Sequence, residues 1–361
     1  MDTGGDDTAG NPAEDAAEAQ TKYVVRLMSR VLGSFTGFVV GEGWGSLWRD
    51  GEWHPGVRSQ LLAYSTAGVV TFAWQVDHGF TAGPTDAIRA ALERWAADRG
   101  DLEPRQIPGW LSEEEALHLR QGATTVEETL AALRSGWPVG TDSTLAVLRA
   151  LPVGLLGAVG LRSLREVATA TAAVTHTGPT TLAAAGLVAQ LYAEALAAST
   201  TDDDVGLVQV IDSVITSRPV TDPLRWRLEH LLRQDPRSLR EPGQRPAPED
   251  PAEVVLTALA ALLAHPGRNV ESWLAALRSV VEARDPVAVR CLVGLLHGAL
   301  HCPGYTPDLE PGVPVDARLW GEMFPVLAML AEDVVLGLVV EPAGRSADDA
   351  EADGWCRRYP A

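Results

Sequence analysis

Lysine, cysteine, aromatic residues and long apolar runs are all scarce in this chain of 361 residues. Lys22 is the only lysine, and aromatic residues make up 6% of the chain. The three cysteines include no C-x-x-C pair and are too few for a disulfide framework. The apolar run 150–161 is short and contains a proline, and the run 325–340 carries two acids, whereas a membrane helix needs about 20 apolar residues. We therefore expect no membrane span and a cytoplasmic protein.

Acidic residues outnumber basic ones, 48 to 29, which gives a formal net charge of −19. The electrostatic field of this negative charge repels nucleic acid and anionic membranes, so neither is expected as a partner. Hydrophobic residues make up 46% of the chain, enough for a sizeable core. Residues 1–20 hold six acids and no base, which is typical of a disordered acidic tail. Because this stretch has no apolar run, we do not expect it to be a signal peptide.

From Lys22 to Val340 the apolar residues follow helical spacing, and no strand-like alternation persists. The pattern predicts an all-α, single-domain helical bundle over 22–340, with a proline-rich internal loop at 234–251 and a polar C-terminal tail at 342–361. Helices are expected near 61–78, 84–99, 112–120, 124–135, 163–177, 179–198, 204–216, 251–264, 270–282, 286–301 and 315–340. Ser112 and Glu115 are spaced as a capping box.

Three glycines, Gly33, Gly37 and Gly41, recur every fourth residue in the first helical stretch. On a helix they share one face, where the missing side chains allow a close approach. The approaching group is either another helix or a ligand.

Several segments, in this order, resemble the ADP-ribosylglycohydrolase family. They include LGSFTGFVVGEGWG (32–45), LRALPVGLL (148–156), AAVTHTGPTTLAAAGLVAQLYAEAL (172–196) and DPVAVRCLVGLLHGAL (285–300). The resemblance implies the all-α bundle of that family. It also implies cleavage of the bond between ADP-ribose and a protein side chain with a pair of magnesium ions.

The resemblance places the metal ligands at positions where this chain keeps few acids. Glu42 replaces an aspartate of the opening motif, and Asp285 matches the first acid of the late motif. Ser65 and Thr66 align with two further aspartates, and Val287 stands where another belongs. Two carboxylates suffice for one weakly bound magnesium ion but not for two. We expect no cofactor, or at most one weak Mg²⁺ held by Glu42 and Asp285.

The loop that approaches the nucleotide in the family is shortened here and has lost its glycines. It reads TDSTLAVLR (141–149). By resemblance, the candidate ligand-binding residues are Thr141, Asp142, Ser143, Arg149, His176 and Trp44. His176 has a structural alternative, tying one helix end to the next turn. Trp44, with Trp48 and Trp53, is expected near the mouth of the cleft, either stacking on a base, plugging the pocket or simply packing.

His297 and His301 are four residues apart, which places both imidazoles on one helix face. This spacing suits zinc, with Asp285 or Cys291 as a third ligand, but it also suits two packed histidines.

Two classes of function follow, and a third is kept open. The first is a catalytically degenerate ADP-ribosylglycohydrolase-like protein that binds an ADP-ribose-like small molecule or a protein partner in or near the old cleft. The second is an active hydrolase of ADP-ribosylated or related N-glycosidic substrates that uses one metal or none. The third is a redeployed enzyme of small-molecule biosynthesis.

Overall fold

The computed structural model describes residues 12–50, 56–77, 79, 82–103, 109–114, 117, 126–201, 205–235, 250–280, 283, 285–301, 322–339 and 358–359, without the side chains of 12, 45–50, 77 and 199–201. In chain order its helices are α1 (Pro12–Asp50), α2 (Val57–Asp77), α3 (Pro84–Asp98), η1 (Trp110–Glu113), α4 (Glu127–Ser135), α5 (Thr144–Leu148), η4 (Leu151–Val159), α6 (Leu164–Ala173), α7 (Pro179–Thr201), α8 (Leu207–Ser217), α9 (Pro223–Arg233), α10 (Pro251–Ala264), α11 (Val270–Ser279), α12 (Pro286–His301) and α13 (Phe324–Leu338).

The all-α architecture is confirmed: apart from one bridge between Val139 and His176, the described residues form helices, turns and connections. Helices α3, α10 and α12 begin at prolines, whose fixed φ suits the first helical turn. The segment 151–159, rich in glycine and leucine, forms the 3-10 helix η4.

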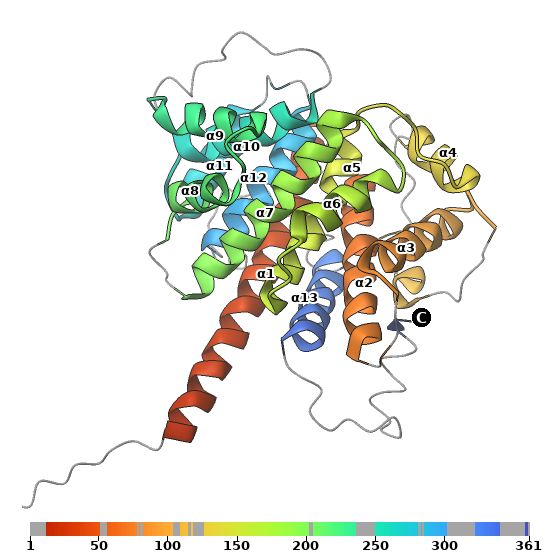
Figure 1. Ribbon diagram of the computed structural model, residues 1–361, viewed down its shortest axis with the longest axis horizontal. Coiled ribbons are helices and arrows are strands. Elements are labelled where there is room, and N and C mark those ends of the chain that lie inside the picture. Colours follow the sequence, from red (N-terminus) through yellow and green to blue (C-terminus); the bar gives the residue numbers. More distant parts are fainter. Residues whose placement is uncertain are drawn as a thin grey trace, which may run out of the picture.

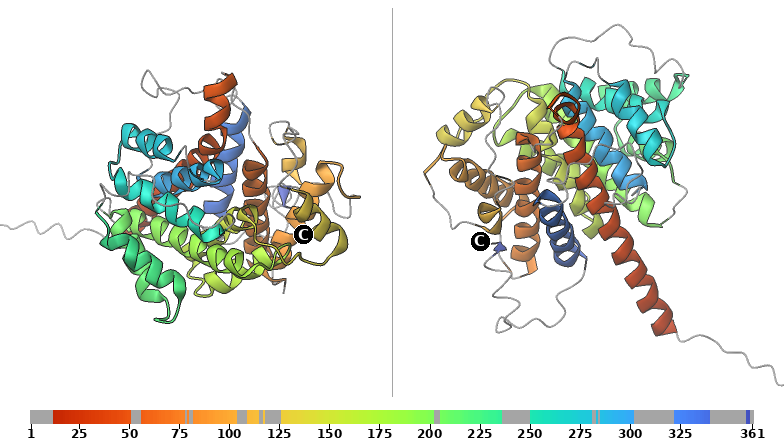
Figure 2. Two further views of the ribbon diagram at one scale, coloured as in Figure 1. Left: turned by 90° about the horizontal axis from the view of Figure 1, so that it is seen from above. Right: turned by 180° about the vertical axis from the view of Figure 1, so that it is seen from behind.

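Three long helices, α1, α7 and α12, run through the centre of the molecule (Figure 1). Helices α8 to α11 gather on one side of them, and α2, α3 and α4 lie on the other. α13 packs against both α1 and α2, as the view from behind also shows (Figure 2). The arrangement places the first turns of α2 and α12 beside the C-terminal half of α1.

The glycine stripe of α1 packs against α12. A Cβ atom on Gly37 would lie 2.2 Å from the carbonyl oxygen of Gly294, and one on Gly41 would lie 2.3 Å from that of Arg290. Gly298 meets Gly33 in the same way. The two backbones therefore touch, and of the two occupants considered for this glycine face, another helix is the one found.

Two expectations need correction. α1 begins at Pro12, so residues 12–20 of the predicted disordered tail are helical and project from the bundle, with residues 13–20 exposed (Figures 1 and 2). Of the predicted helix 112–120 the structure describes residues 112–114 and 117, which carry 3-10 geometry at 112–113 (in η1) and at 117, while the other residues, including Glu115, lie outside the described part. Ser112 does not cap a helix there, because its hydroxyl donates to Asp98 (2.7 Å).

The remaining organisational predictions fall largely outside the described residues. These include residues 1–11, most of the loop 234–251 and most of the tail 342–361. Two helical stretches, Ala13–Trp44 and Pro179–Ala198, are long and apolar enough to cross a membrane by composition. In the most apolar 18-residue window of each, 61% and 67% of the residues respectively are buried within the molecule, as in core helices.

Substituting Gly37 by alanine tests the α1–α12 contact. The added methyl group would meet backbone atoms that cannot rotate away, so the helices must separate. We expect a loss of about 1–3 kcal/mol of stability, the usual cost of overpacking a core. Gly140→Ala is the control, because a Cβ there meets nothing within 4 Å. Denaturant unfolding followed by circular dichroism measures both, and equal stability of the two variants would contradict the contact.

Candidate functional site

The carboxylate of Glu42 closes the N-terminal end of α2. Its Oε2 accepts hydrogen bonds from the backbone N–H of Gly56 (3.1 Å) and Ser59 (2.8 Å) and from the Ser59 hydroxyl (2.5 Å). Its Oε1 accepts from the N–H of Arg58 (2.9 Å). The first N–H groups of a helix lack intrahelical partners, and the helix dipole favours negative charge there. Glu42 therefore serves as a cap supplied by another helix.

Asp285 plays the matching part at α12. Its Oδ1 accepts from the N–H of Ala288 (3.0 Å), which caps the first turn. The guanidinium Nη2 of Arg58 donates to both carboxylate oxygens, at 3.2 and 3.0 Å. Arg58 thus touches Glu42 through its backbone and Asp285 through its side chain. The structure brings the two predicted acids to one residue.

The guanidinium of Arg58 is largely buried in this cluster. Burial acts to lower the pKa of Arg58, but the negative charges of Asp285 and Glu42, with the nearby Cys291, outweigh it and raise the pKa. The thiol of Cys291 is fully buried, and burial together with Glu42 raises its pKa well above the usual value. The cluster therefore joins two acidic side chains, one guanidinium and one buried thiol.

Ser65 and Thr66, expected to stand at the metal-ligand positions of α2, lie elsewhere. Both are buried in the middle of the helix, and the Thr66 hydroxyl donates to the carbonyl of Leu62 (2.8 Å). Ser65 is six residues beyond Ser59, which is roughly 9 Å along the helix axis. The α2 residues that hydrogen-bond to Glu42 or Asp285 are Arg58 and Ser59, and not Ser65 or Thr66. Val287 lies in the first turn of α12, partly buried against the core.

The polar residues of the predicted nucleotide loop cap neighbouring helices. Asp142 Oδ1 accepts from the N–H (2.9 Å) and hydroxyl (3.1 Å) of Thr181 in the first turn of α7. Burial acts to raise the pKa of Asp142, but the hydrogen bonds from Thr180 and Thr181 lower it overall. The Ser143 hydroxyl accepts from the N–H of Ala146 (3.3 Å) and caps α5. Thr141 donates to Glu128 (2.7 Å).

His176 and Arg149 are both buried beside this loop. His176 Nδ1 lies 2.7 Å from the Thr175 hydroxyl, and its Nε2 lies 3.4 Å from Glu128. Burial and the charge of Arg149 lower the pKa of His176 to about 4. Arg149 donates to the carbonyl of Ala172 (2.9 Å) at the C-terminal end of α6, and burial lowers its pKa to about 9. Through these contacts both side chains bind neighbouring protein groups, which is a structural role that does not depend on a ligand.

Trp44 does not lie at the mouth of a cleft. It is 3% exposed and belongs to the hydrophobic core. The side chain of Trp48 and the whole of Trp53 lie outside the described residues. Of the three roles considered for Trp44, the structure supports packing.

His297 and His301 form a packed pair in the last turns of α12. Their ring centroids are 5.0 Å apart with an edge-on geometry, and His297 also stacks on Trp273. Asp285 is twelve residues before His297, which is roughly 18 Å along the helix, so it cannot join the pair as a metal ligand. Cys291 is roughly 9 Å away by the same measure. Cys302 lies outside the described residues.

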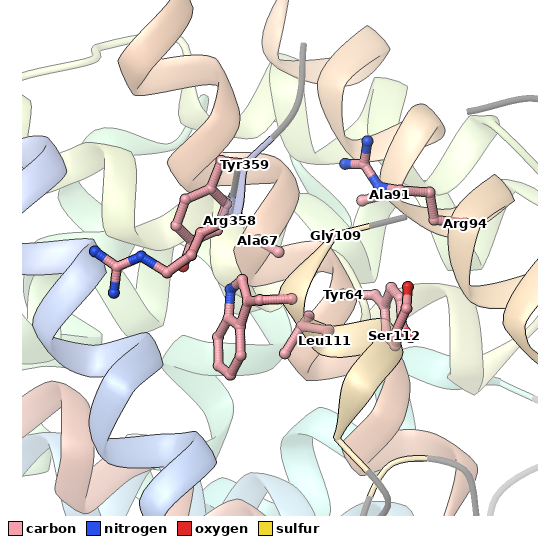
Figure 3. A pocket seen from close by; sticks show the side chains of 10 residues that line it. Tyr64, Ala67, Ala91, Arg94, Gly109, Leu111, Ser112, Arg358 and Tyr359 are labelled. Carbon is pink, nitrogen blue, oxygen red and sulfur yellow. The ribbon is translucent and has the colours of Figure 1, made fainter. Parts of the chain in front are cut away.

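A pocket between α2, α3 and η1 receives the C-terminal residues Arg358 and Tyr359 (Figure 3). The Tyr359 hydroxyl donates to Asp333 of α13 (2.6 Å), and Arg358 forms an ion pair with the same carboxylate (3.1 Å). Asp333 and Tyr359 are each 1% exposed. Within the tail predicted to be polar, the described residues therefore include a buried tyrosine that contacts the core.

Comparison with known families places these features in context. The model of the ADP-ribosylglycohydrolase family matches residues 7–306. The chain belongs to the ADP-ribosylglycohydrolase family. No curated protein matches it in a sequence comparison.

The buried histidines predict acid sensitivity. Burial lowers the pKa of His297 to about 3 and that of His301 to about 4, and a neighbouring positive charge adds to each shift. An unfolded chain protonates its histidines near pH 6.5, whereas the folded protein keeps these rings neutral. Stability is therefore present above pH 6.5 and is lost as the pH falls to 3–4.

The His297→Gln variant should lose stability less steeply over this range, by up to about 1.4 kcal/mol per pH unit, because one proton fewer is taken up on unfolding. His230→Gln is the control, since His230 is exposed. Urea unfolding between pH 4 and 8 measures the slopes, and the same slope for wild type and His297→Gln would contradict the shift.

Removing the hydroxyl of Tyr359 tests the C-terminal contact. Tyr359→Phe keeps the ring but deprives the buried Asp333 of a donor, which should cost about 1.5–3 kcal/mol. Tyr23→Phe is the control, because Tyr23 is only partly buried and its hydroxyl makes no hydrogen bond within the described part of the chain. Thermal unfolding compares them, and an unchanged melting temperature for Tyr359→Phe would show that the contact does not hold in solution.

Proposed function

We propose that this protein is a non-hydrolytic member of the ADP-ribosylglycohydrolase family that acts by binding. The observation that carries the proposal is the pairing of Asp285 with the guanidinium of Arg58. A positive side chain is held where the resemblance calls for metal-binding carboxylates.

The donor set does not suit a pair of magnesium ions. Mg²⁺ demands oxygen ligands in near-octahedral geometry, and two adjacent ions carry four positive charges. Glu42 already accepts four hydrogen bonds from the start of α2, and Asp285 is shared between Arg58 and the start of α12. Val287 offers no ligand atom. A guanidinium in the same cluster adds repulsion to any incoming cation.

Loss of the ions removes what the family's chemistry depends on. In an oxocarbenium-like transition state, the ions position the ribose hydroxyls and offset developing charge. Arg58 cannot take over both tasks, because it has no coordination sites for sugar hydroxyls and is bound to Asp285. This supports binding without turnover.

The capped loop 141–149 points to an altered ligand. The side-chain oxygens of Asp142 and Ser143 accept hydrogen bonds from the starts of α7 and α5. The loop also lacks the glycines that let a backbone approach a nucleotide. We propose an ADP-ribose-like small molecule or a protein partner as the ligand. The net charge of −19 argues against nucleic acid or an anionic membrane surface.

A turnover assay on ADP-ribosylarginine tests this function. We expect no multiple turnover by the wild-type protein, with or without Mg²⁺, and no two-ion binding in calorimetry with Mn²⁺ as the probe. Val287→Asp alone should not restore activity, because Arg58 remains beside Asp285. Metal-dependent multiple turnover by the wild-type protein would support the active-hydrolase alternative instead.

A further inference from the structure

The guanidinium of Arg58 lies beside two acids, Glu42 of α1 and Asp285 at the start of α12. We infer that Arg58 is the resident cation of the Glu42–Asp285 pair, and that its replacement by a carboxylate turns the cluster into a divalent-cation site. The inference rests on the proposed absence of metal ligation in the wild-type protein. It also names the cause of that absence, which is that the Arg58 side chain of α2 takes the place of a divalent cation.

The net charge of the cluster depends on the residue at position 58. Glu42 and Asp285 contribute −2 and Arg58 contributes +1, which leaves −1 in a largely buried cluster. With aspartate at position 58 the same three residues carry −3. Buried carboxylates that repel one another require a cation or protons. A divalent ion would return the cluster to −1.

The fixed backbone carries the second step. The N–H of residue 58 is held by Glu42 at 2.9 Å, and this bond does not depend on the side chain of Arg58. Residue 58 therefore stays at the cluster when its side chain changes. Asp285 is likewise held by its cap to Ala288. The α1–α12 backbone contact fixes Glu42 and the first turns of α12 relative to each other.

Side-chain length carries the third step. Arg58 reaches Asp285 through the Nη2 atom at the end of its side chain, and an aspartate side chain is several atoms shorter. The space that this exchange leaves between position 58 and Asp285 is bordered by carboxylate oxygens. The Ser59 hydroxyl lies 2.5 Å from Glu42 at the edge of the same cluster. Oxygen donors of this kind suit Mg²⁺ or Mn²⁺, with waters completing the shell.

The experiment compares melting temperatures in EDTA and in rising concentrations of MgCl₂ or MnCl₂. Wild type and Arg58→Lys, which keeps a cation, should show no saturable response. Arg58→Asp should melt lower than wild type in EDTA and gain a few degrees, saturably, with Mn²⁺. The double variant Arg58→Asp/Asp285→Asn loses a ligand and should lose most of that gain.

Calorimetry with Mn²⁺ should give one site in Arg58→Asp and none in wild type. Saturable Mn²⁺ binding by the wild-type cluster, abolished by Asp285→Asn, would overturn the inference. An equal cation response of Arg58→Asp and the double variant would do the same. If Arg58→Asp does not fold, Arg58→Ser removes the positive charge more gently and should bind Mn²⁺ more weakly but measurably. Failure of a folded Arg58→Ser to bind any Mn²⁺ would then count against the inference.

These outcomes are separable from those of the proposed function. Metal-free turnover by wild type would contradict the non-hydrolytic function and leave the role of Arg58 intact. Absence of cation binding in folded Arg58 variants would contradict the role of Arg58, while an inactive wild type would still support the proposed function.

Discussion

The backbone contact between α1 and α12 is the constraint on which the rest of the structure depends. Gly37 and Gly294 allow the two helices to touch without intervening side chains. Because α1 extends past this contact, Glu42 reaches the start of α2, and because α12 begins just before it, Asp285 reaches Arg58. A wider spacing of the two helices would separate these groups. Packing of the smallest residues thus decides where the charged ones meet.

Three carboxylates of the molecule accept hydrogen bonds at the starts of helices. Glu42 caps α2, Asp285 caps α12 and Asp142 caps α7, each through backbone N–H groups. A carboxylate used in this way is stabilised by the helix dipole and by hydrogen bonds, without a metal. All three acids are partly buried, where a carboxylate without a partner is costly. Because the helix starts supply these partners, the three carboxylates need no metal ion for their stabilisation.

The sequence allowed the all-α class and most helices to be predicted, because prolines, glycines and family motifs mark these places. It did not allow Arg58 to be found. Residues 59–71 of α2 are buried all round the helix, so no polar stripe marks its faces or its starting point. The resemblance pointed to Ser65 and Thr66, whereas the α2 residues that hydrogen-bond to the two acids are Arg58 and Ser59. For Trp44 three roles stayed open for a related reason, since composition does not distinguish a core tryptophan from one at a cleft.

The exchange that we propose at position 58 follows from the energetics of clustered acids. Several carboxylates held together for metal binding repel one another when no ion is bound, and this repulsion lowers the stability of the folded protein. A guanidinium supplies its positive charge at every metal concentration and cannot dissociate. It also forms directional hydrogen bonds to a carboxylate, which a hydrated ion provides only through exchangeable ligands. Such an exchange favours a stable scaffold over metal chemistry, and a protein that works by binding alone loses nothing by it.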